Sequence, residues 1–225
     1  MSKTTIPSGG IGADIIDATK IADDAISEEH LDATAITGLT ALGAEPADTD
    51  ELIISDAGTL KRMDYSHIKG GGIVEVDMWR LTSGFSGAAS PIDSNWERAD
   101  TEDFAVLGTG LTQSSGVFTF PSTGYYFIIF QAAYSINGDK RNIGTIIQHT
   151  TDNGSNWTDL AYSSDHIAQS ESDATMTTGV VSAIAHIVDA SNDKVRFNAG
   201  TSGVNTSNDT NAQHTGFTCI KLADT

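Results

Sequence analysis

The chain has 225 residues, enough for one or two domains, with 22 glycines, 4 prolines and 1 cysteine. Its formal net charge of −18 argues against binding of nucleic acid and against attachment to an anionic membrane surface, because both need clustered Lys and Arg. The abundance of Gly, Ser, Thr, Asn and Asp favours a mainly β protein with many turns. A single cysteine excludes an intrachain disulfide, and we expect Cys219, in an apolar stretch, to be a buried thiol.

The first residues, MSKTTIPSGG, contain no apolar h-region, so we expect no secretory signal and synthesis in the cytosol. No apolar run is long enough to cross a bilayer, so we expect no membrane insertion. Within residues 1–42 an apolar residue recurs at every fifth position. A spacing of five puts no stripe on a helix and no single face on a strand, so we expect short capped turns joined by extended pieces. The repeated positions are Ile11, Ile16, Ile21, Ile26, Leu31 and Ile36.

This tract cannot bury its own row of apolar residues, because an isolated turn of helix is unstable in water. Three copies around a common axis would cover the row, and so would a groove on a larger assembly. Disorder is an alternative, given the excess of acidic residues. A pentapeptide solenoid is disfavoured, because Asp14, Asp24 and Glu29 stand where it needs small residues. The stretch ATKIADDAISEEHL resembles the repeats of bacteriophage fibre proteins, which implies a stalk or virion-attachment region over residues 1–42.

Residues 43–72 are predicted to form a β-hairpin connector. Two short strands, at residues 51–55 and 59–65, flank a turn at residues 56–58. A lone hairpin is marginally stable, so we expect it to pack against copies of itself or against a neighbour. The stretch DELIISDAGTLKRMDYSHI resembles a small module of phage tail and fibre proteins. Three glycines at 70–72 mark the expected boundary to a head domain over residues 73–225.

Residues 116–134, GVFTFPSTGYYFIIFQAAY, are typical of two strands and the turn between them. Residues 125–134 are apolar on both faces, which predicts a strand buried inside a sandwich. The pattern G-x-F-T-x-P-x-x-G-x-Y resembles the globular head of the complement first component, a member of the tumour-necrosis-factor-like jelly rolls, which assemble as trimers. Ile128 departs from that pattern, since the family usually has an aromatic residue there. The residues that carry the resemblance are Gly116, Phe118, Thr119, Pro121, Gly124 and Tyr126.

The resemblance continues in order through residues 104–107, 179–188, 192–197 and 214–220, and so covers about 104–222. It implies a mainly β protein with a C-terminal jelly-roll β-sandwich, preceded by an extended N-terminal stalk of short repeats and a β-hairpin. His186, in an apolar strand, is predicted to be a core histidine. The residues expected to be buried, within the jelly roll or at its subunit contacts, are Phe118, Phe120, Tyr126, Ile128, Phe130, Ile184, Val195, Phe197 and Phe217.

The sequence contains no nucleophile elbow, H-E-x-x-H, P-loop or Cys–His pairing, so we predict no enzyme activity, no cofactor and no metal site. His149 and His214 fall near strand ends, and a ring of three histidines on a trimer axis is an alternative for either. Asp and Asn in residues 164–178 and 200–213 show no spaced pattern of ligands, which disfavours a Ca²⁺ loop.

The two resemblances together predict a virion structural protein. We expect a homotrimeric phage fibre, a tail or short fibre, whose residues 6–42 dock onto other virion proteins and whose jelly-roll head binds the host surface. The chain lacks the collagen-like G-X-Y repeat that normally precedes a complement-type head, which argues against an immune role. A capsid head fibre or decoration trimer is one alternative, and a non-viral secreted lectin-like binding module is another.

Receptor recognition is expected in loops opposite the two chain ends, among residues 137–142, 151–157, 163–178 and 200–213. Trp157 is the leading candidate, because its large indole lies among turn formers in DNGSNWT. It would stack on a sugar of a host surface polysaccharide, with amides and carboxylates taking the hydroxyls. The alternative is that Trp157 folds back onto the sandwich edge or a neighbouring subunit. The full set of candidates is Trp157, Asn156, Asn153, Asp152, Asp139, Tyr162, His166, Asn205 and Asn208.

Overall fold

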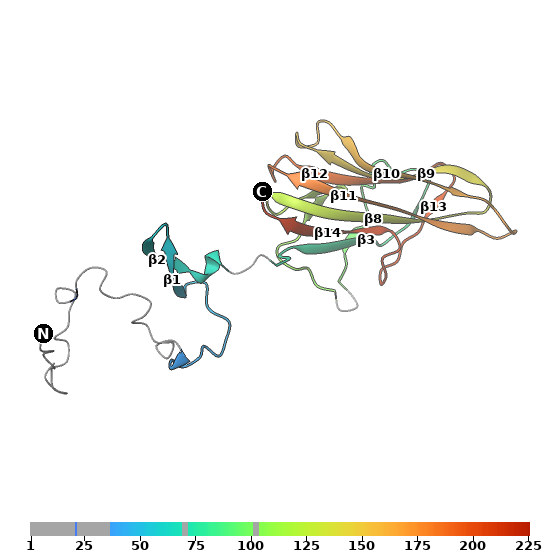
Figure 1. The fold of residues 1–225 in the computed structure, drawn as a ribbon. Helices are drawn as coiled ribbons and strands as arrows, with labels where there is room; N and C mark the ends of the chain where they lie inside the picture. The colour runs from blue at the N-terminus through green and yellow to red at the C-terminus, as the bar shows by residue number, and fades with distance from the viewer. Residues whose placement is uncertain (1–20, 22–36, 69–71, 101–103) are drawn as a thin grey trace, which may run out of the picture. The chain divides into compact units, whose positions relative to one another are not determined.

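The computed structural model describes residues 21, 37–68, 72–100 and 104–225. The chain divides into two units, Met1–Lys69 and Gly70–Thr225 (Figure 1). The predicted boundary lay between residues 72 and 73. The predicted repeats of residues 1–42 lie outside the described residues, apart from Ile21 and residues 37–42.

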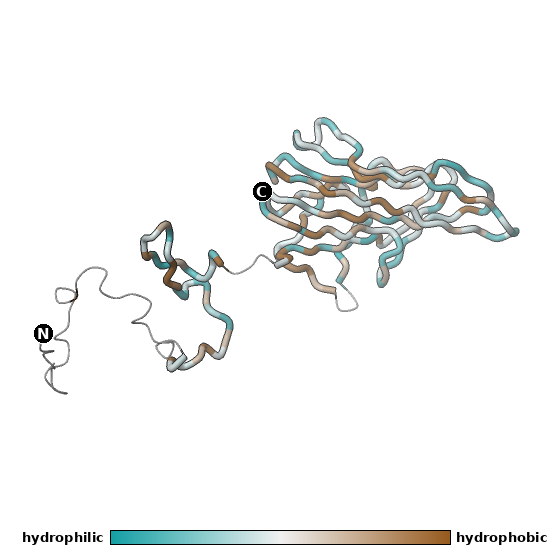
Figure 2. The backbone as a smooth tube through the Cα atoms, in the orientation of Figure 1, coloured by the Kyte–Doolittle hydropathy of each residue, from teal (hydrophilic) through white to brown (hydrophobic). Residues whose placement is uncertain are grey.

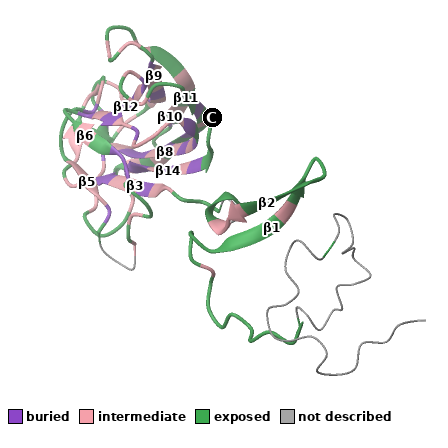
Figure 3. Ribbon diagram, turned by 90° about the vertical axis from the view of Figure 1, so that its left-hand side faces the viewer, coloured by how far each residue is buried: buried purple, intermediate pink, exposed green. Residues whose placement is uncertain are grey.

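The N-terminal unit contains the predicted hairpin, formed by β1 (Glu51–Asp56) and β2 (Thr59–Asp64) and followed by the 3₁₀ turn η2 (Tyr65–His67). Its strands pair antiparallel, and positive φ angles at Ala57 and Gly58 make the tight turn. Figure 3 shows the two strands exposed along most of their length. Ile53 is 82% exposed and Leu60 is 77% exposed, so this ribbon buries little apolar surface within its own unit.

The C-terminal unit is a sandwich of two antiparallel sheets (Figure 1). The first sheet has five strands in the order β10-β9-β12-β7-β6. The second has seven strands: six follow the order β4-β13-β8-β14-β3-β5, and β11 pairs with β8 along its whole length. The strands are β3 (Val76–Leu81), β4 (Phe85–Ser86), β5 (Trp96–Arg98), β6 (Thr112–Ser114), β7 (Val117–Thr119), β8 (Gly124–Ile136), β9 (Lys140–Thr150), β10 (Thr158–Ile167), β11 (Thr175–Ile187), β12 (Lys194–Gly200), β13 (Asn205–Thr206) and β14 (Gly216–Ala223).

The core lies between the two sheets, and Figure 2 shows apolar residues along the strands that enclose it. Alternate residues of β8 point inward, and Phe130 meets Phe197 of the facing sheet with ring centroids 4.8 Å apart. Phe118 and Phe217 form an edge-to-face pair at 4.7 Å, a favoured aromatic geometry. Eight of the nine predicted core residues are buried, and Cys219 is buried as predicted.

Two predictions about burial are wrong for this chain, that His186 lies in the core and that β8 is buried on both faces. For Ile184 the structure excludes burial within the jelly roll and leaves its other predicted place, a subunit contact. Ile184 is 57% exposed and His186 is also exposed, because both point outward from β11, on the face away from the core. His186 stacks on Tyr125, with ring centroids 4.3 Å apart. The outward face of β8 is only partly covered, since Tyr125 is exposed and Phe127 is half-buried there. These outcomes share one cause, since apolar residues on an outward face give the same alternating pattern as residues in the core.

The segment at residues 104–111 is connected to the seven-stranded sheet mainly through side-chain hydrogen bonds and only to a small extent through strand pairing. Residues 104–107, through which the family resemblance runs, form a single bridge, between Leu107 and Val76. The buried Asp77 carboxylate accepts hydrogen bonds from the Leu111 amide at 2.7 Å and from the Arg98 guanidinium at 2.9 Å. Charge pairing and a backbone donor together satisfy this buried acid, as burial of a charge requires.

The strand registers place the chain ends of this unit together. Strand β3 begins at Val76 opposite Ile220, and β14 ends at Ala223 opposite Tyr125. Gly72 and Val74 line one shallow pocket with residues 221–224. The C-terminus lies at the left-hand end of the sandwich in Figure 1. The turn at 151–157 belongs to the same end, because His149 and Thr150 precede it opposite the start of β12. Residues 137–139 and 168–174 connect strands at the opposite end.

Candidate functional site

The nine predicted site residues fall in three places in the C-terminal unit. Four lie together in and beside the β9–β10 turn: Asp152, Asn153, Asn156 and Trp157. Tyr162 and His166 are exposed along β10, the edge strand of the five-stranded sheet. The remaining three, Asp139, Asn205 and Asn208, lie toward the end opposite the chain termini.

The carboxylate of Asp152 builds the β9–β10 turn. It accepts hydrogen bonds from the Thr150 hydroxyl at 2.6 Å, from the Asn156 amide N–H at 2.9 Å and from the Asn156 side-chain amide at 2.7 Å. These bonds, the one from Thr150 first, lower the pKa of Asp152 to about 2. The polar groups of Asp152 and Asn156 are therefore hydrogen-bonded within the turn and are poorly placed to bind the hydroxyls of a sugar.

Trp157 lies over the outward face of the five-stranded sheet. Its indole N–H donates to the Gly154 carbonyl at 3.1 Å, and the Arg196 guanidinium of β12 lies 4.2 Å from its ring centroid. One face of the ring is therefore occupied by a cation of the same chain, a favourable cation–π contact. This is the arrangement of the predicted alternative, in which the indole folds back onto the sandwich.

A groove of about 420 Å³ opens beside this indole. We call it the Trp157 groove, and its lining residues are Ser114, Val117, Thr119, Asn153, Gly154, Trp157, Lys194 and Arg196. Sequence reasoning missed its two cations. Their signal was the alternation K-V-R-F at 194–197, which places Lys194 and Arg196 on the face opposite the buried Val195 and Phe197.

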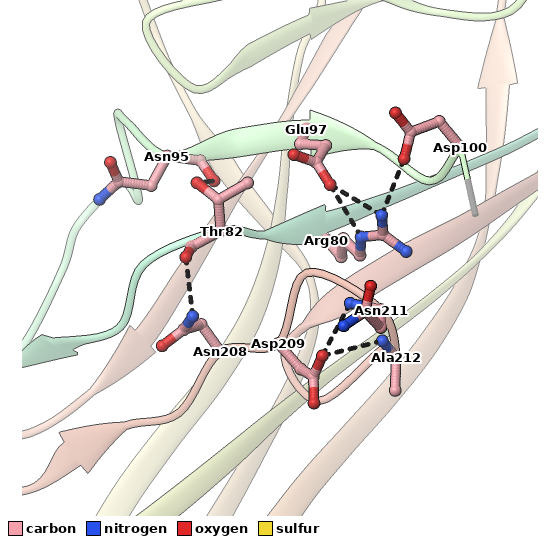
Figure 4. Close-up of polar contacts among 9 residues, drawn as sticks. All are labelled: Arg80, Thr82, Asn95, Glu97, Asp100, Asn208, Asp209, Asn211 and Ala212. Atoms are coloured by element: carbon pink, nitrogen blue, oxygen red, sulfur yellow. Dashed lines mark hydrogen bonds and ion pairs between the residues drawn. The ribbon is translucent and has the colours of Figure 1, made fainter. Parts of the chain in front are cut away.

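Asn208 has a structural role (Figure 4). Its side-chain nitrogen donates to the Thr82 carbonyl at 2.7 Å, the bond drawn in Figure 4. Its side-chain oxygen accepts from the Gly84 amide at 2.8 Å. In the following turn Asp209 accepts from the amides of Asn211 and Ala212. The amide of Asn208 thus fastens the loop before β14 to the segment after β3, and it is not free to bind a receptor.

The remaining candidates are spread over the surface and form no cluster. The Asp139 carboxylate accepts from the Gln169 amide at 2.7 Å, which ties the β8–β9 turn to the β10–β11 loop. Asn205 is exposed on the two-residue strand β13. Tyr162 is 57% exposed on β10. The end away from the chain termini therefore offers two exposed polar groups, Asp139 in the β8–β9 turn and Asn205 on β13.

A second surface stands out on the opposite face of the sandwich. Across β11, β8 and β14, no outward position carries Asp, Glu, Lys or Arg, in a chain whose net charge is −18. One row crosses four strands as Ile184, Phe127, Ile220 and Val76. We call this surface the apolar sheet face, and its most exposed members are Tyr125, Met176, Val180, Ile184 and Leu222.

Within the described parts of the chain, no group of three or more His, Cys, Asp and Glu residues is placed to hold a metal ion. His149 points into the sandwich on the same face as Val195, where burial lowers its pKa and Asp193, 3.6 Å away, opposes that effect. A ring of His149 side chains on a trimer axis is therefore ruled out by their inward direction. No helix among the described residues is long and apolar enough to cross a membrane.

Comparison with solved structures supports the fold. The chain is similar to Eiger TNF from S. frugiperda, with a TM-score of 0.53 and 15% identity over 68% of this chain and 96% of that chain. Murine APRIL aligns with a TM-score of 0.45 and 14% identity, over 66% of this chain and 98% of that one. No protein-family model and no curated protein matches the sequence. The likeness to Eiger TNF and the strand order together define a jelly-roll β-sandwich, as the sequence predicted.

Proposed function

We propose that this chain is a virion structural protein, a homotrimeric bacteriophage fibre whose jelly-roll unit binds the host surface. Residues 6–42 dock onto other virion proteins, and the bound ligand is a surface polysaccharide. The fibre-like repeats of the sequence support the virion part of this proposal. The apolar sheet face supports the assembly, and it is the observation that carries the proposal.

The cost of leaving that face in water favours assembly of several copies, and a trimer is the assembly that we propose. Burying apolar surface contributes about 25 cal/mol per Å². Ile184, Phe127 and Ile220 form a continuous row, so a second copy seated there would gain this free energy without having to bury a charge. Closed cyclic symmetry then covers the same face on every subunit.

The shared end of the two chain termini supports a direction for the fibre. The described part of the C-terminal unit begins at Gly72, which lines a pocket with residues 221–224 at the end of the sandwich that holds the C-terminus. A virion attached through residues 6–42 would then leave the loops at 137–139 and 168–174 pointing outward. Asp139 belongs to this tip, whereas Trp157 does not, so Trp157 would contact a ligand from the flank of the fibre.

Two measurements test the proposal. Sedimentation equilibrium of the purified chain should give three times the subunit mass of 23.6 kDa, and a monomer at micromolar concentration would contradict the trimer. Electron microscopy of particles labelled at this chain should place the label on tail or short fibres. A label on the capsid shell would instead favour a capsid fibre or decoration protein, and particles without the chain would refute a virion role.

A further inference from the structure

The Trp157 groove lies on the outward face of the five-stranded sheet, where β6, β7 and β12 run side by side. Ser114, Val117 and Arg196 occupy successive strands there, since Ser114 pairs with Val117 and Val117 pairs with Arg196. The β9–β10 turn overhangs them through Gly154 and Trp157. Its volume of about 420 Å³ falls within the range of small-molecule sites.

The charge of the groove is opposite to that of the chain. Lys194 and Arg196 both line it, and none of its lining residues is acidic, although the chain carries 30 Asp and Glu against 12 Lys and Arg. Among the described residues, no carboxylate lies within ion-pair distance of either cation. Asp159 acts on Arg196 only from beyond ion-pair distance, through its charge and through Gln148. Two cations without a direct ion pair in so acidic a chain favour an anionic ligand.

The guanidinium of Arg196 is held in place before any ligand arrives. Its Nε donates to the Gln148 side-chain oxygen at 2.7 Å, and the Gln148 side-chain nitrogen donates to Asp159 at 2.7 Å. Trp157 covers one face of the guanidinium at 4.2 Å. These contacts fix the plane of the group and leave its two terminal nitrogens as donors, the fork that binds a carboxylate in two hydrogen bonds.

The neutral lining of the groove suits a hydroxylated ligand. Ser114 and Thr119 offer hydroxyls, and Asn153 offers an amide that can donate and accept. We propose that the Trp157 groove binds a carboxylate-bearing sugar, of the uronic acid class, as a unit of an acidic polysaccharide. Arg196 and Lys194 bind the carboxylate, and the hydroxyls and the amide bind the ring.

This inference deepens the proposed host-binding role and rests on it, but it concerns a different face from the proposed trimer contact. Arg196 lies on the five-stranded sheet, whereas Ile184 lies on the outward face of the seven-stranded one. Assembly through the apolar sheet face therefore leaves the groove open to solvent on each subunit.

Isothermal titration of the full chain with sodium glucuronate, glucose and inorganic phosphate tests the site. We expect glucuronate to bind, and glucose and phosphate to bind much more weakly, because one lacks the charge and the other lacks the ring. Binding of phosphate as tight as that of glucuronate would overturn the sugar assignment. Equal binding of glucose would overturn the role of the cations, and absence of any binding would overturn the site.

Variants locate the binding. Arg196→Gln and Lys194→Gln should each weaken glucuronate binding by about tenfold to a hundredfold, the value of a hydrogen bond to a charged group. Arg141→Gln, at an exposed cation near the other end of β9, is the matched control and should leave binding unchanged. Unchanged affinity in Arg196→Gln, with an unaltered melting temperature, would overturn the proposal.

The test separates this inference from the proposed function. If the chain sediments as a trimer and joins particles but does not bind glucuronate, the fibre proposal stands and the groove assignment falls. If glucuronate binds to a chain that is monomeric and absent from particles, the groove assignment stands and the fibre proposal falls.

Discussion

At the scale of single residues, Asp152 shows how a polar loop residue can be structural. Its pKa in the folded chain is lowered to about 2 by hydrogen bonds, chiefly from Thr150 and Asn156. A lowered carboxyl pKa stabilises the fold above the unfolded pKa, and this contribution is lost as the pH falls toward the folded one. We therefore expect the β9–β10 turn to keep its structure at pH 5 and to loosen between about pH 4 and pH 2.

An NMR titration that follows the side-chain carboxyl of Asp152 and the Asn156 amide measures this directly. Both signals should move together, with a midpoint well below that of an exposed Asp. The variant Asp152→Asn should abolish the shared transition. A midpoint near 4 for Asp152, the ordinary value for Asp, would show that the turn does not depend on its carboxylate.

Phe130, unlike Asp152, has the role that the sequence predicted for it, which is burial in the core. It is fully buried against Phe197, with their ring centroids 4.8 Å apart. The variant Phe130→Ala should lower the free energy of unfolding by about 3–5 kcal/mol, because it removes apolar burial and leaves a cavity. Urea denaturation at one fixed protein concentration measures it, since association adds to the apparent stability. A loss below about 1 kcal/mol would contradict the burial.

What the sequence could predict at this scale follows from the range of the interactions. Phe118 and Phe130 are buried by the alternation of their own strands, which is a local signal. The position of Trp157 depends on Arg196, which is 39 positions away in the chain (196 − 157) and is brought to it by the pairing of β9 with β12. A local pattern contains no information about such a partner, so Lys194 and Arg196 were missed.

At the scale of elements, the hairpin and the jelly-roll sandwich were predictable, but the exposed face of β8 and β11 was not. An apolar residue on an outward face has the same sequence signal as one in the core. Ile184 and His186 lie on β11 beside Phe127 and Tyr125 of β8, and the four point away from the core. These strands do contain more apolar residues than the core accommodates, and the additional ones lie on the surface of the sheet.

The apolar sheet face gives a prediction about this pair of strands. The variant Ile184→Asp should shift the chain from trimer to monomer at micromolar concentration, because it places a charge in a contact that excludes water. Tyr162→Asp is the matched control, since Tyr162 and Ile184 are each 57% exposed but lie on different sheets. Sedimentation velocity measures the change, and circular dichroism checks that both variants are folded. If the Ile184→Asp variant remained trimeric, the apolar sheet face would not be the trimer contact.

At the scale of the whole molecule, the register of the sandwich decides which loops share an end. The sequence identified the loops at 137–142 and 151–157 but could not place them. Residues 151–157 lie at the end that holds the C-terminus, and residues 137–139 lie at the other. That assignment needs the pairing of β9 with β12 and of β14 with β8, which are contacts between distant segments. For this reason the sequence could name Trp157 as a candidate but could not show that its turn lies at the same end as the C-terminus.

The division into two units gives the last prediction. The jelly roll has its own core within residues 70–225, so it does not need the N-terminal repeats in order to fold. Deleting residues 1–42 should leave a head that is folded and trimeric, with the melting temperature of the jelly roll unchanged, but that no longer joins particles. The full chain with the same tag is the control, and incorporation is measured by mass spectrometry of purified particles. Truncated chains found in particles at the level of the control would show that residues 6–42 are not the attachment segment. A monomeric truncated chain would show that the trimer contact lies in the N-terminal tract and not on the apolar sheet face.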